Sequence, residues 1–233
     1  MPSSTLYQTL TIVLKLIKEG SLFVQNSVRL IQPEAQTHKP ITPAKIVCVG
    51  RNYVDHIKEL NNEVPDQPVY FLKPNSAISN TLYSVLGEPL HYETEICFLV
   101  EQGKLIAAGV GLDITKRGLQ SQLKAKSLPW ERAKAFDGSA LFSDFVAIDS
   151  LSQQLQLKLW IDSVLVQQGG ISLMLHKPDA VLADIAEFMT LQDGDILMTG
   201  TPKGVGQIVA GLRFVAQLLD GEQCLTEVSW VAV

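Results

Sequence analysis

Two long apolar runs joined by a short polar turn constrain the fold of this chain more than any other feature. The first run is HYETEICFLV, residues 91–100, the second is LIAAGVGLDI, residues 105–114, and EQGK links them. Apolar runs of this length on either side of a Gly-containing turn are typical of paired strands. The sequence therefore predicts a β-hairpin over residues 91–114.

This predicted hairpin carries an unusual set of polar residues. Side chains alternate between the faces of a strand, so His91, Glu93 and Glu95 are expected on one face, and Asp113 ends the second strand. Converging carboxylates repel each other and are costly to bury, and a hard divalent cation relieves both costs. Mg²⁺ is the first expectation and Mn²⁺ the second. The Glu-x-Glu spacing alone is equally typical of a solvent-facing edge strand.

Short strands and a few short helices are predicted along the rest of the main domain. Turn residues such as Asp162 and Ser163 separate apolar runs at hairpin spacing, and Asp113 or Thr115 could cap the helix that follows them. The fold class expected is α+β, dominated by β structure. The predicted strands are 45–50, 69–74 and the two arms of a hairpin over 155–170. Residues 51–62 are predicted to form a short helix or a structured loop, and residues 128–136 to begin a short helical turn. Helices are predicted over 115–126 and 178–191, the last with an apolar face of Leu182, Ile185, Ala186 and Met189.

Residues 1–43 are expected to form an N-terminal extension or small subdomain, and residues 44–233 the main domain. Apolar residues at helical spacing predict a helix from Leu6 to Ile17, and a strand is possible near residues 21–31. The Pro- and Thr-rich stretch QPEAQTHKPITPAK, residues 32–45, is interpreted as a connector.

Composition narrows the classes of partner. The net charge is −5 and the basic residues are scattered, so no nucleic-acid surface is expected. No apolar interval of 18 residues occurs, so no membrane span is expected. Cys48, Cys97 and Cys224 are far apart in apolar runs, which predicts buried, reduced thiols. With no secretory signal pattern, the expected location is cytoplasmic and the expected partner is a small molecule.

His56 and Glu59 are candidates for a general-base pair. Their i, i+3 spacing places an imidazole beside a carboxylate on one helix face. A carboxylate raises the basicity of the imidazole and fixes its orientation, as is needed to remove a proton from water. The same spacing also occurs on ordinary exposed helix surfaces.

Lys134 lies among Trp130, Ala133 and Phe136, so its ammonium group is expected to be partly desolvated. A fixed cation beside a metal site can stabilise a developing oxyanion. A surface lysine on a short amphipathic helix is the alternative, and the same two interpretations apply to Lys73.

The loop TGTPKGVG, residues 199–206, is rich in Gly and could hold a carboxylate or phosphate on its backbone amides. A plain turn with Gly at positive φ is equally compatible with it. The spacing fits neither a P-loop nor a dinucleotide-binding fingerprint, and the chain has no GxSxG, CxxC or HExxH motif.

Six motifs, in this order, resemble the fumarylacetoacetate hydrolase family, especially its small acylpyruvase and oxaloacetate decarboxylase-like branch. The resemblance runs from about residue 44 to the C-terminus, and its motifs are VCVGRNYVDHIKEL, VYFLKP, HYETE, GLDITKRGLQ, LPWERAKAFD and GDILMTGTPKGVG.

The resemblance implies a mixed β-roll or sandwich, usually a homodimer, with Mg²⁺ or Mn²⁺ on Glu93, Glu95 and Asp113. His56 and Glu59 would belong to a lid that activates water. The other implied site residues are Lys134 as a catalytic residue and Arg51, Lys73, Gln120, Gly200 and Thr201 as substrate-binding residues.

The implied reaction is hydrolysis of a C–C bond in an acylpyruvate-type 1,3-diketo acid, giving pyruvate and a carboxylic acid through an enolate held at the metal. Oxaloacetate decarboxylation and isomerisation of a hydroxymuconate-type acid pass through the same enolate, so both remain alternatives. A non-catalytic, metal-stabilised dimer is a further alternative. The chain differs from the family in its N-terminal extension and in the short segment EQGKLIAAGVG before Asp113.

Overall fold

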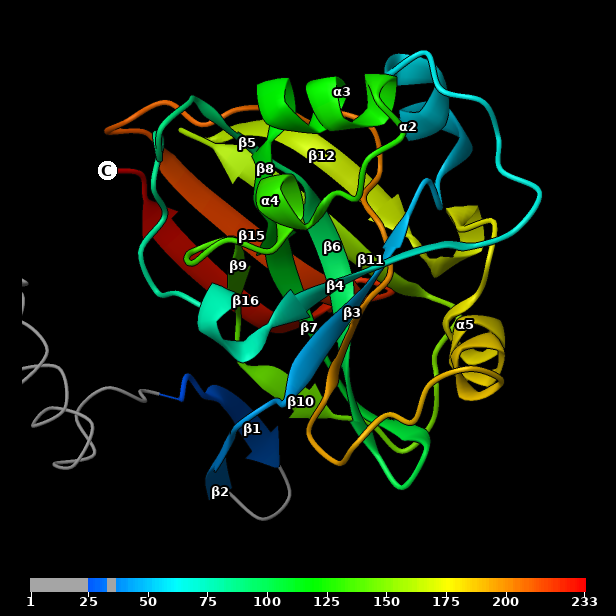
Figure 1. Ribbon diagram of the computed structural model, residues 1–233. Helices are drawn as coiled ribbons and strands as arrows, with labels where there is room; N and C mark the ends of the chain where they lie inside the picture. Colours follow the sequence, from blue (N-terminus) through cyan, green and yellow to red (C-terminus); the bar gives the residue numbers. More distant parts are fainter. Residues whose placement is uncertain (1–24, 33–36) are drawn as a thin grey trace, which may run out of the picture.

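The computed structural model describes residues 25–32 and 37–233, and most of their regular structure is β (Figure 1). The predicted helix between Leu6 and Ile17 lies outside the described residues. No helix within the described ranges is long and apolar enough to cross a membrane. The helices are α2 (Val54–Glu59), α3 (Arg117–Ala125), α4 (Glu131–Lys134) and α5 (Pro178–Ala186), with 3₁₀ turns η1 (Asn75–Ala77) and η2 (Ile171–Leu173).

The largest sheet has nine strands, in the order β2-β1-β10-β7-β6-β13-β3-β4, with β9 also paired to β7. Its strands are β1 (Val28–Gln32), β2 (Thr37–Ile41), β3 (Lys45–Gly50), β4 (Val69–Pro74), β6 (Thr94–Glu101), β7 (Lys104–Asp113), β9 (Ala140–Phe142), β10 (Phe145–Ala147) and β13 (Ile196–Met198).

Two smaller sheets complete the β structure. One has the order β12-β11-β15-β16 and the other the order β14-β5-β8. Their strands are β5 (Leu90–Tyr92), β8 (Thr115–Lys116), β11 (Leu155–Ile161), β12 (Val164–Gly170), β14 (Gly206–Gln207), β15 (Arg213–Asp220) and β16 (Gln223–Val231).

The core is built on both faces of the nine-stranded sheet. In β6, Ile96 and Phe98 pack toward β11 and β15, whereas Cys97 and Leu99 point to the opposite face and join a second apolar cluster. Strands buried on both faces are continuously apolar, as ICFLV is. Burial of Cys48 and Cys97 confirms that part of the thiol prediction, but Cys224 is exposed because it faces outward near the β15–β16 turn.

The predicted hairpin over residues 91–114 is confirmed as β6 and β7, which pair antiparallel from Thr94↔Leu112 to Glu101↔Lys104. Gln102 and Gly103 both have positive φ, as a two-residue hairpin turn requires. The hairpin β11–β12 with its turn at Asp162 and Ser163 is also confirmed.

Three local predictions were wrong. The predicted connector contains the strand β2, which pairs with β1, and β1 in turn pairs with β10 of the same large sheet. Neither predicted residue caps α3; Glu88 Oε1 instead accepts from Gly118 N at 2.9 Å. In α5, which ends at residue 186 instead of 191, the prediction was wrong in part: Ile185 is buried and Met189 packs against the core, but Ala186 is exposed and the other buried residues are Pro178 and Val181.

Candidate metal and active site

The centre of the site is a group of three buried carboxylates, Glu93, Glu95 and Asp113, which we call the acidic floor. Each residue offers one oxygen, and these oxygens all lie within 4.8 Å of one another. Glu93 lies between β5 and β6, where the chain passes from the small sheet to the large one. Asp113 N donates to Glu93 O at 2.8 Å, so the hairpin itself brings the third carboxylate to the first two.

His91 does not join this group. The chain breaks from strand geometry at Glu93, so β5 and β6 are separate strands in different sheets. His91 pairs instead with Thr115 in β8 and Gln207 in β14, and it is half-buried there. The prediction that the imidazole lies on one strand face with both glutamates was therefore wrong, whereas the three carboxylates expected as metal ligands do lie together.

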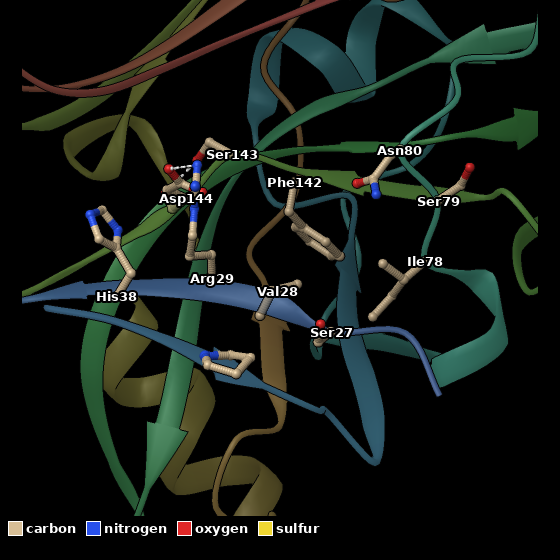
Figure 2. Close-up of a pocket in the computed structure, with 11 residues that line it drawn as sticks. Ser27, Val28, Arg29, His38, Ile78, Ser79, Asn80, Phe142, Ser143 and Asp144 are labelled. Atoms are coloured by element: carbon tan, nitrogen blue, oxygen red, sulfur yellow. Dashed lines mark hydrogen bonds and ion pairs between the residues drawn. The ribbon is translucent and has the colours of Figure 1, made fainter. Parts of the chain in front are cut away.

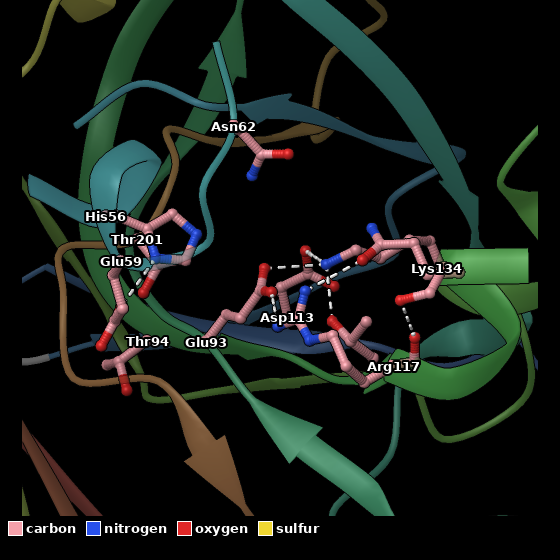
Figure 3. A network of polar contacts seen from close by, with 12 residues as sticks. His56, Glu59, Asn62, Glu93, Thr94, Asp113, Arg117, Lys134 and Thr201 are labelled. Atoms are coloured by element: carbon pink, nitrogen blue, oxygen red, sulfur yellow. Dashed lines mark hydrogen bonds and ion pairs between the residues drawn. The ribbon is translucent and has the colours of Figure 1, made fainter. Parts of the chain in front are cut away.

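Lysine and arginine side chains neutralise part of the acidic floor (Figure 3). Lys134 Nζ lies 2.8 Å from Glu93 Oε2 and 2.6 Å from Asp113 Oδ2, and it is only 2 % exposed. Lys73 Nζ lies 2.8 Å from Asp113 Oδ1, and Arg117 pairs with Glu93 Oε1. These positions of Lys134 and Lys73 favour the buried interpretation over that of surface lysines.

The two glutamates have opposite electrostatic environments. Burial alone would raise the pKa of the Glu93 carboxyl, but the charges of Lys134, Arg117 and His56 together hold that pKa well below its usual value. Burial, and then the negative charge of Asp113, raise the pKa of Glu95 well above its usual range. Glu93 is therefore stable as a carboxylate, whereas the charge of Lys134 offsets only part of the cost of ionising Glu95.

Glu95 accepts a hydrogen bond from Gly200 N at 2.8 Å, and no described Lys, Arg or His forms an ion pair with it. A buried carboxylate without a cation is costly. Three carboxylates also form the hard oxygen donor set that Mg²⁺ and Mn²⁺ prefer. The acidic floor therefore fits a divalent cation, with Glu95, Glu93 and Asp113 as the residues that would hold it.

The His56 and Glu59 pair lies on α2, beside the acidic floor. His56 Nδ1 is 3.2 Å from Glu59 Oε2, and His56 is 6 % exposed while Glu59 is partly open to solvent. Glu59 Oε1 also accepts from Gly204 N at 3.0 Å. The carboxylate thus orients the imidazole and also attaches α2 to the loop of residues 199–206.

That loop requires glycine where it meets the acidic floor. Gly200 has φ +93°, and a Cβ there would lie 2.9 Å from Asn52 Cβ and 3.0 Å from Val49 O. Asn52 Nδ2 donates to Thr199 O at 2.9 Å and holds the loop in place. The Gly200 amide binds the carboxylate of Glu95, a side chain of the protein itself, and the positive φ of Gly200 is that of the alternative, a plain turn. Binding of a substrate anion by this loop stays a prediction.

A pocket lies over the acidic floor, and the space in it that water-sized molecules can reach is about 40 Å³. Most predicted site residues line it, and the remaining ones touch those that do: Lys73 contacts Asp113, Glu59 contacts His56 and Gly200 contacts Glu95. The predicted residues in the lining are Arg51, His56, Glu93, Glu95, Asp113, Gln120, Lys134 and Thr201. Their roles in binding and catalysis stay predictions.

Two cations in the pocket wall were not predicted, Arg117 and Lys124. Arg117 Nη1 donates to Gln120 Oε1 at 2.9 Å, and Lys124 Nζ donates to Asn62 Oδ1 at 2.7 Å. Both belong to α3, three residues before and four after Gln120, so all three share one helix face. That spacing around Gln120 is the signal in the sequence that could have identified them.

Comparison with known proteins agrees with this architecture. The model of the fumarylacetoacetate (FAA) hydrolase C-terminal family matches residues 45–229. The oxaloacetate tautomerase YcgM of Escherichia coli is 37 % identical over 204 residues, which cover 79 % of this chain and 92 % of that protein.

Two solved structures are also similar. A proposed fumarylacetoacetate isomerase/hydrolase from Oleispira antarctica has a TM-score of 0.81 at 36 % identity, covering 88 % of this chain and 99 % of that one. Fumarylpyruvate hydrolase from Pseudomonas aeruginosa, in complex with Mn²⁺ and pyruvate, has a TM-score of 0.79 at 26 % identity, covering 91 % and 98 %. The chain therefore belongs to the fumarylacetoacetate hydrolase family.

Proposed function

We propose that this protein is a divalent-metal-dependent enzyme that acts on a small 2-oxo dicarboxylic acid, with the keto–enol interconversion of oxaloacetate as its first candidate reaction. The observation that carries this proposal is the acidic floor, in which Glu95 lacks a cationic partner, next to the His56–Glu59 pair. Similarity to oxaloacetate tautomerase YcgM supports the choice of substrate.

The charge of the pocket supports a substrate with two carboxylates. Four cations line the pocket, Arg51, Arg117, Lys124 and Lys134, against the three carboxylates of the acidic floor. A divalent ion would make the net charge of the pocket more positive. A substrate with two negative charges would neutralise that charge better than a substrate with one.

A divalent ion on the acidic floor would supply Lewis-acid polarisation of the oxygens of the substrate. Keto–enol interconversion moves one proton from carbon 3 of the oxo acid to its 2-oxygen. Glu59 engages His56 Nδ1, which leaves Nε2 as the nitrogen that can take and return this proton. Lys134 provides a fixed positive charge where negative charge develops.

Hydrolysis of an acylpyruvate-type diketo acid is the second candidate, because His56 with Glu59 could equally deprotonate water for attack on the distal carbonyl. The similar fumarylpyruvate hydrolase, solved with Mn²⁺ and pyruvate, supports it. Decarboxylation of oxaloacetate and isomerisation of a hydroxymuconate-type acid would use the same site. A silent, metal-stabilised dimer would not need the His56–Glu59 pair.

We also infer Mg²⁺ or Mn²⁺ as the metal, from the all-carboxylate donor set. A reducing, cytoplasmic location is inferred from the free, buried thiols of Cys48 and Cys97. A homodimer is the expected assembly from the family resemblance, and light scattering of the purified protein tests it.

The experiment is a substrate panel with Mg²⁺, with Mn²⁺ and with EDTA. Keto–enol exchange of oxaloacetate, its decarboxylation, and pyruvate release from acetylpyruvate and fumarylpyruvate are followed separately, together with isomerisation of a hydroxymuconate-type acid. We expect metal-dependent exchange of oxaloacetate at the highest kcat/KM. Faster pyruvate release from an acylpyruvate would favour the second candidate, and no turnover of any substrate would refute an enzymatic function.

A further inference from the structure

Gln167 connects the two halves of the site from a strand that contributes no other residue to it. It lies on β12 of the four-stranded sheet, and it is 1 % exposed. Its side-chain amide makes hydrogen bonds at both ends, to the start of β6 on one side and to the loop of residues 199–206 on the other.

At one end, Gln167 Oε1 accepts from Thr94 N at 3.1 Å. Thr94 is the residue between Glu93 and Glu95, at the point where the chain enters the large sheet. A buried amide that the sheet does not satisfy needs another acceptor. Gln167 therefore fixes the peptide that joins the two glutamates of the acidic floor.

At the other end, Gln167 Nε2 donates to Thr201 Oγ1 at 2.9 Å and to Pro202 O at 2.8 Å. Thr201 lines the pocket, and Gly200 beside it binds Glu95. The strand can lie this close to the loop because residue 169 is glycine: a Cβ there would be only 2.7 Å from Pro202 Cβ. One rigid amide thus spans from the acidic floor to the pocket wall.

We propose that Gln167 is a positioning residue that sets the spacing between the metal-binding glutamates and the substrate-binding Thr201. The inference rests on the proposed function, since it assumes that the acidic floor binds a divalent ion. Only a primary amide supplies one acceptor at one end and two donors at the other. Partners behind metal ligands typically contribute 10–100-fold to metal affinity.

Two substitutions of similar size test this role. Gln167→Met removes all three hydrogen bonds, whereas Gln167→Glu keeps an acceptor for Thr94 N but loses both donors to the loop. The matched control is Gln168→Met, because Gln168 is the exposed neighbour on the same strand and its side chain makes one hydrogen bond, to Gln156 at 3.5 Å. Mn²⁺ affinity, KM, kcat and Tm are measured for each protein.

We expect Gln167→Met to weaken Mn²⁺ binding by about 10-fold and to raise KM, and Gln167→Glu to raise KM more than it weakens Mn²⁺ binding. Gln168→Met should match the unsubstituted protein in all four measurements. Mn²⁺ affinity and KM unchanged in Gln167→Met would overturn the proposal even if Tm fell, since that result describes a structural residue only.

If neither Gln167 variant folds, the proposal is also overturned, because Gln167 would then be required for the fold itself. If the unsubstituted protein binds Mn²⁺ but turns over no substrate, the proposed reaction is refuted, and the Mn²⁺ affinities of the variants still test the role of Gln167. If the unsubstituted protein binds no Mn²⁺, both the proposed function and this inference are refuted.

Discussion

The acidic floor and the wall of the pocket are built in different ways. The floor is formed by Glu95 and Asp113 on strands of the large sheet and by Glu93 just before β6, each at most 6 % exposed and held by hydrogen bonds or ion pairs. The wall is formed largely by side chains of α2 and α3, and their exposure varies: His56 and Gln120 are buried, Lys124 is half-buried, and Glu59, which holds His56, is open to solvent. The floor is suited to one fixed ligand, whereas the exposed side chains of the wall can adjust to different bound molecules.

The largest expected effect concerns the floor. Asp113→Asn removes one charge and should weaken Mn²⁺ binding more than 100-fold, since even partners behind metal ligands contribute about 10–100-fold. Titration with Mn²⁺ followed by electron paramagnetic resonance measures this loss. Asp55→Asn, at an exposed residue paired with Lys203, is the control and should bind as the unsubstituted protein does. Retained affinity in Asp113→Asn would contradict the assignment of the floor.

A second prediction separates the wall from the floor. His56→Ala should lower kcat for oxaloacetate exchange by about 10²–10⁴-fold, the usual contribution of a general base, and leave Mn²⁺ affinity unchanged. His38→Ala, at an exposed histidine on β2, should change neither. A parallel loss of Mn²⁺ binding in His56→Ala would show that wall and floor do not act separately.

The third prediction tests selection by the wall. Lys124→Met should raise KM for oxaloacetate by about 10-fold or more, since hydrogen bonds to charged groups contribute roughly 1.5–3 kcal/mol, and leave KM for acetylpyruvate nearly unchanged. Lys126→Met, at the exposed C-terminal end of the same helix, is the control. Equal changes for both substrates would refute a role for Lys124 in binding a second carboxylate.

The smallest expected effect concerns stability without metal. The folded-state pKa of Glu95 is raised above its ordinary value of 4.5, so its contribution to stability is fully present below pH 4.5 and is lost as pH rises through the raised pKa. In EDTA, Tm should therefore fall more steeply with pH in the unsubstituted protein than in Glu95→Gln.

Each kcal/mol moves Tm by about 2–4 °C in a chain of this size, so scanning calorimetry can follow the difference between the two proteins. Glu93 affects the pH dependence of stability in the opposite direction, because its folded-state pKa is lowered. Both proteins contain Glu93, so its effect is the same in each. Parallel pH profiles would contradict an uncompensated Glu95.

Much of the floor could be predicted from the sequence because it depends on local rules. Strand alternation and the hairpin turn bring Glu93, Glu95 and Asp113 together, and the spacing of His56 and Glu59 gives their contact directly. The break at Glu93, which separates His91 from this group, depends on pairing with a different sheet. Alternation along a single strand cannot reveal that change of partner.

The wall and its supports were harder to predict because they depend on tertiary packing. Gln167 is 73 residues from Thr94 and 34 from Thr201 in the sequence, and nothing in β12 itself distinguishes it from Gln168. Glu88 takes the place of the predicted caps of α3 from 30 residues away. Such contacts become visible only when the sheets are placed against each other.

A second cavity lies far from these residues, between β1, β2 and the β9–β10 turn (Figure 2). Arg29 and Asp144 pair at its side, with Arg29 Nε 2.6 Å from Asp144 Oδ1. This contact joins the N-terminal strand pair to the large sheet and adds to the pairing of Leu30 with Phe145. The predicted domain boundary at residue 43 stays a prediction, although β1 and β2 belong to this sheet.

The β6–β7 hairpin carries all three carboxylates of the floor within residues 93–113, a short stretch of chain. Closing so short a loop costs little conformational entropy, and hairpins of this kind form within microseconds. The three carboxylates are therefore close along the chain, whereas the groups that hold them, Lys73, Lys134 and Gly200, come from other segments. A divalent ion bound by the three carboxylates would then stabilise the β6–β7 hairpin itself, in addition to any role in a reaction.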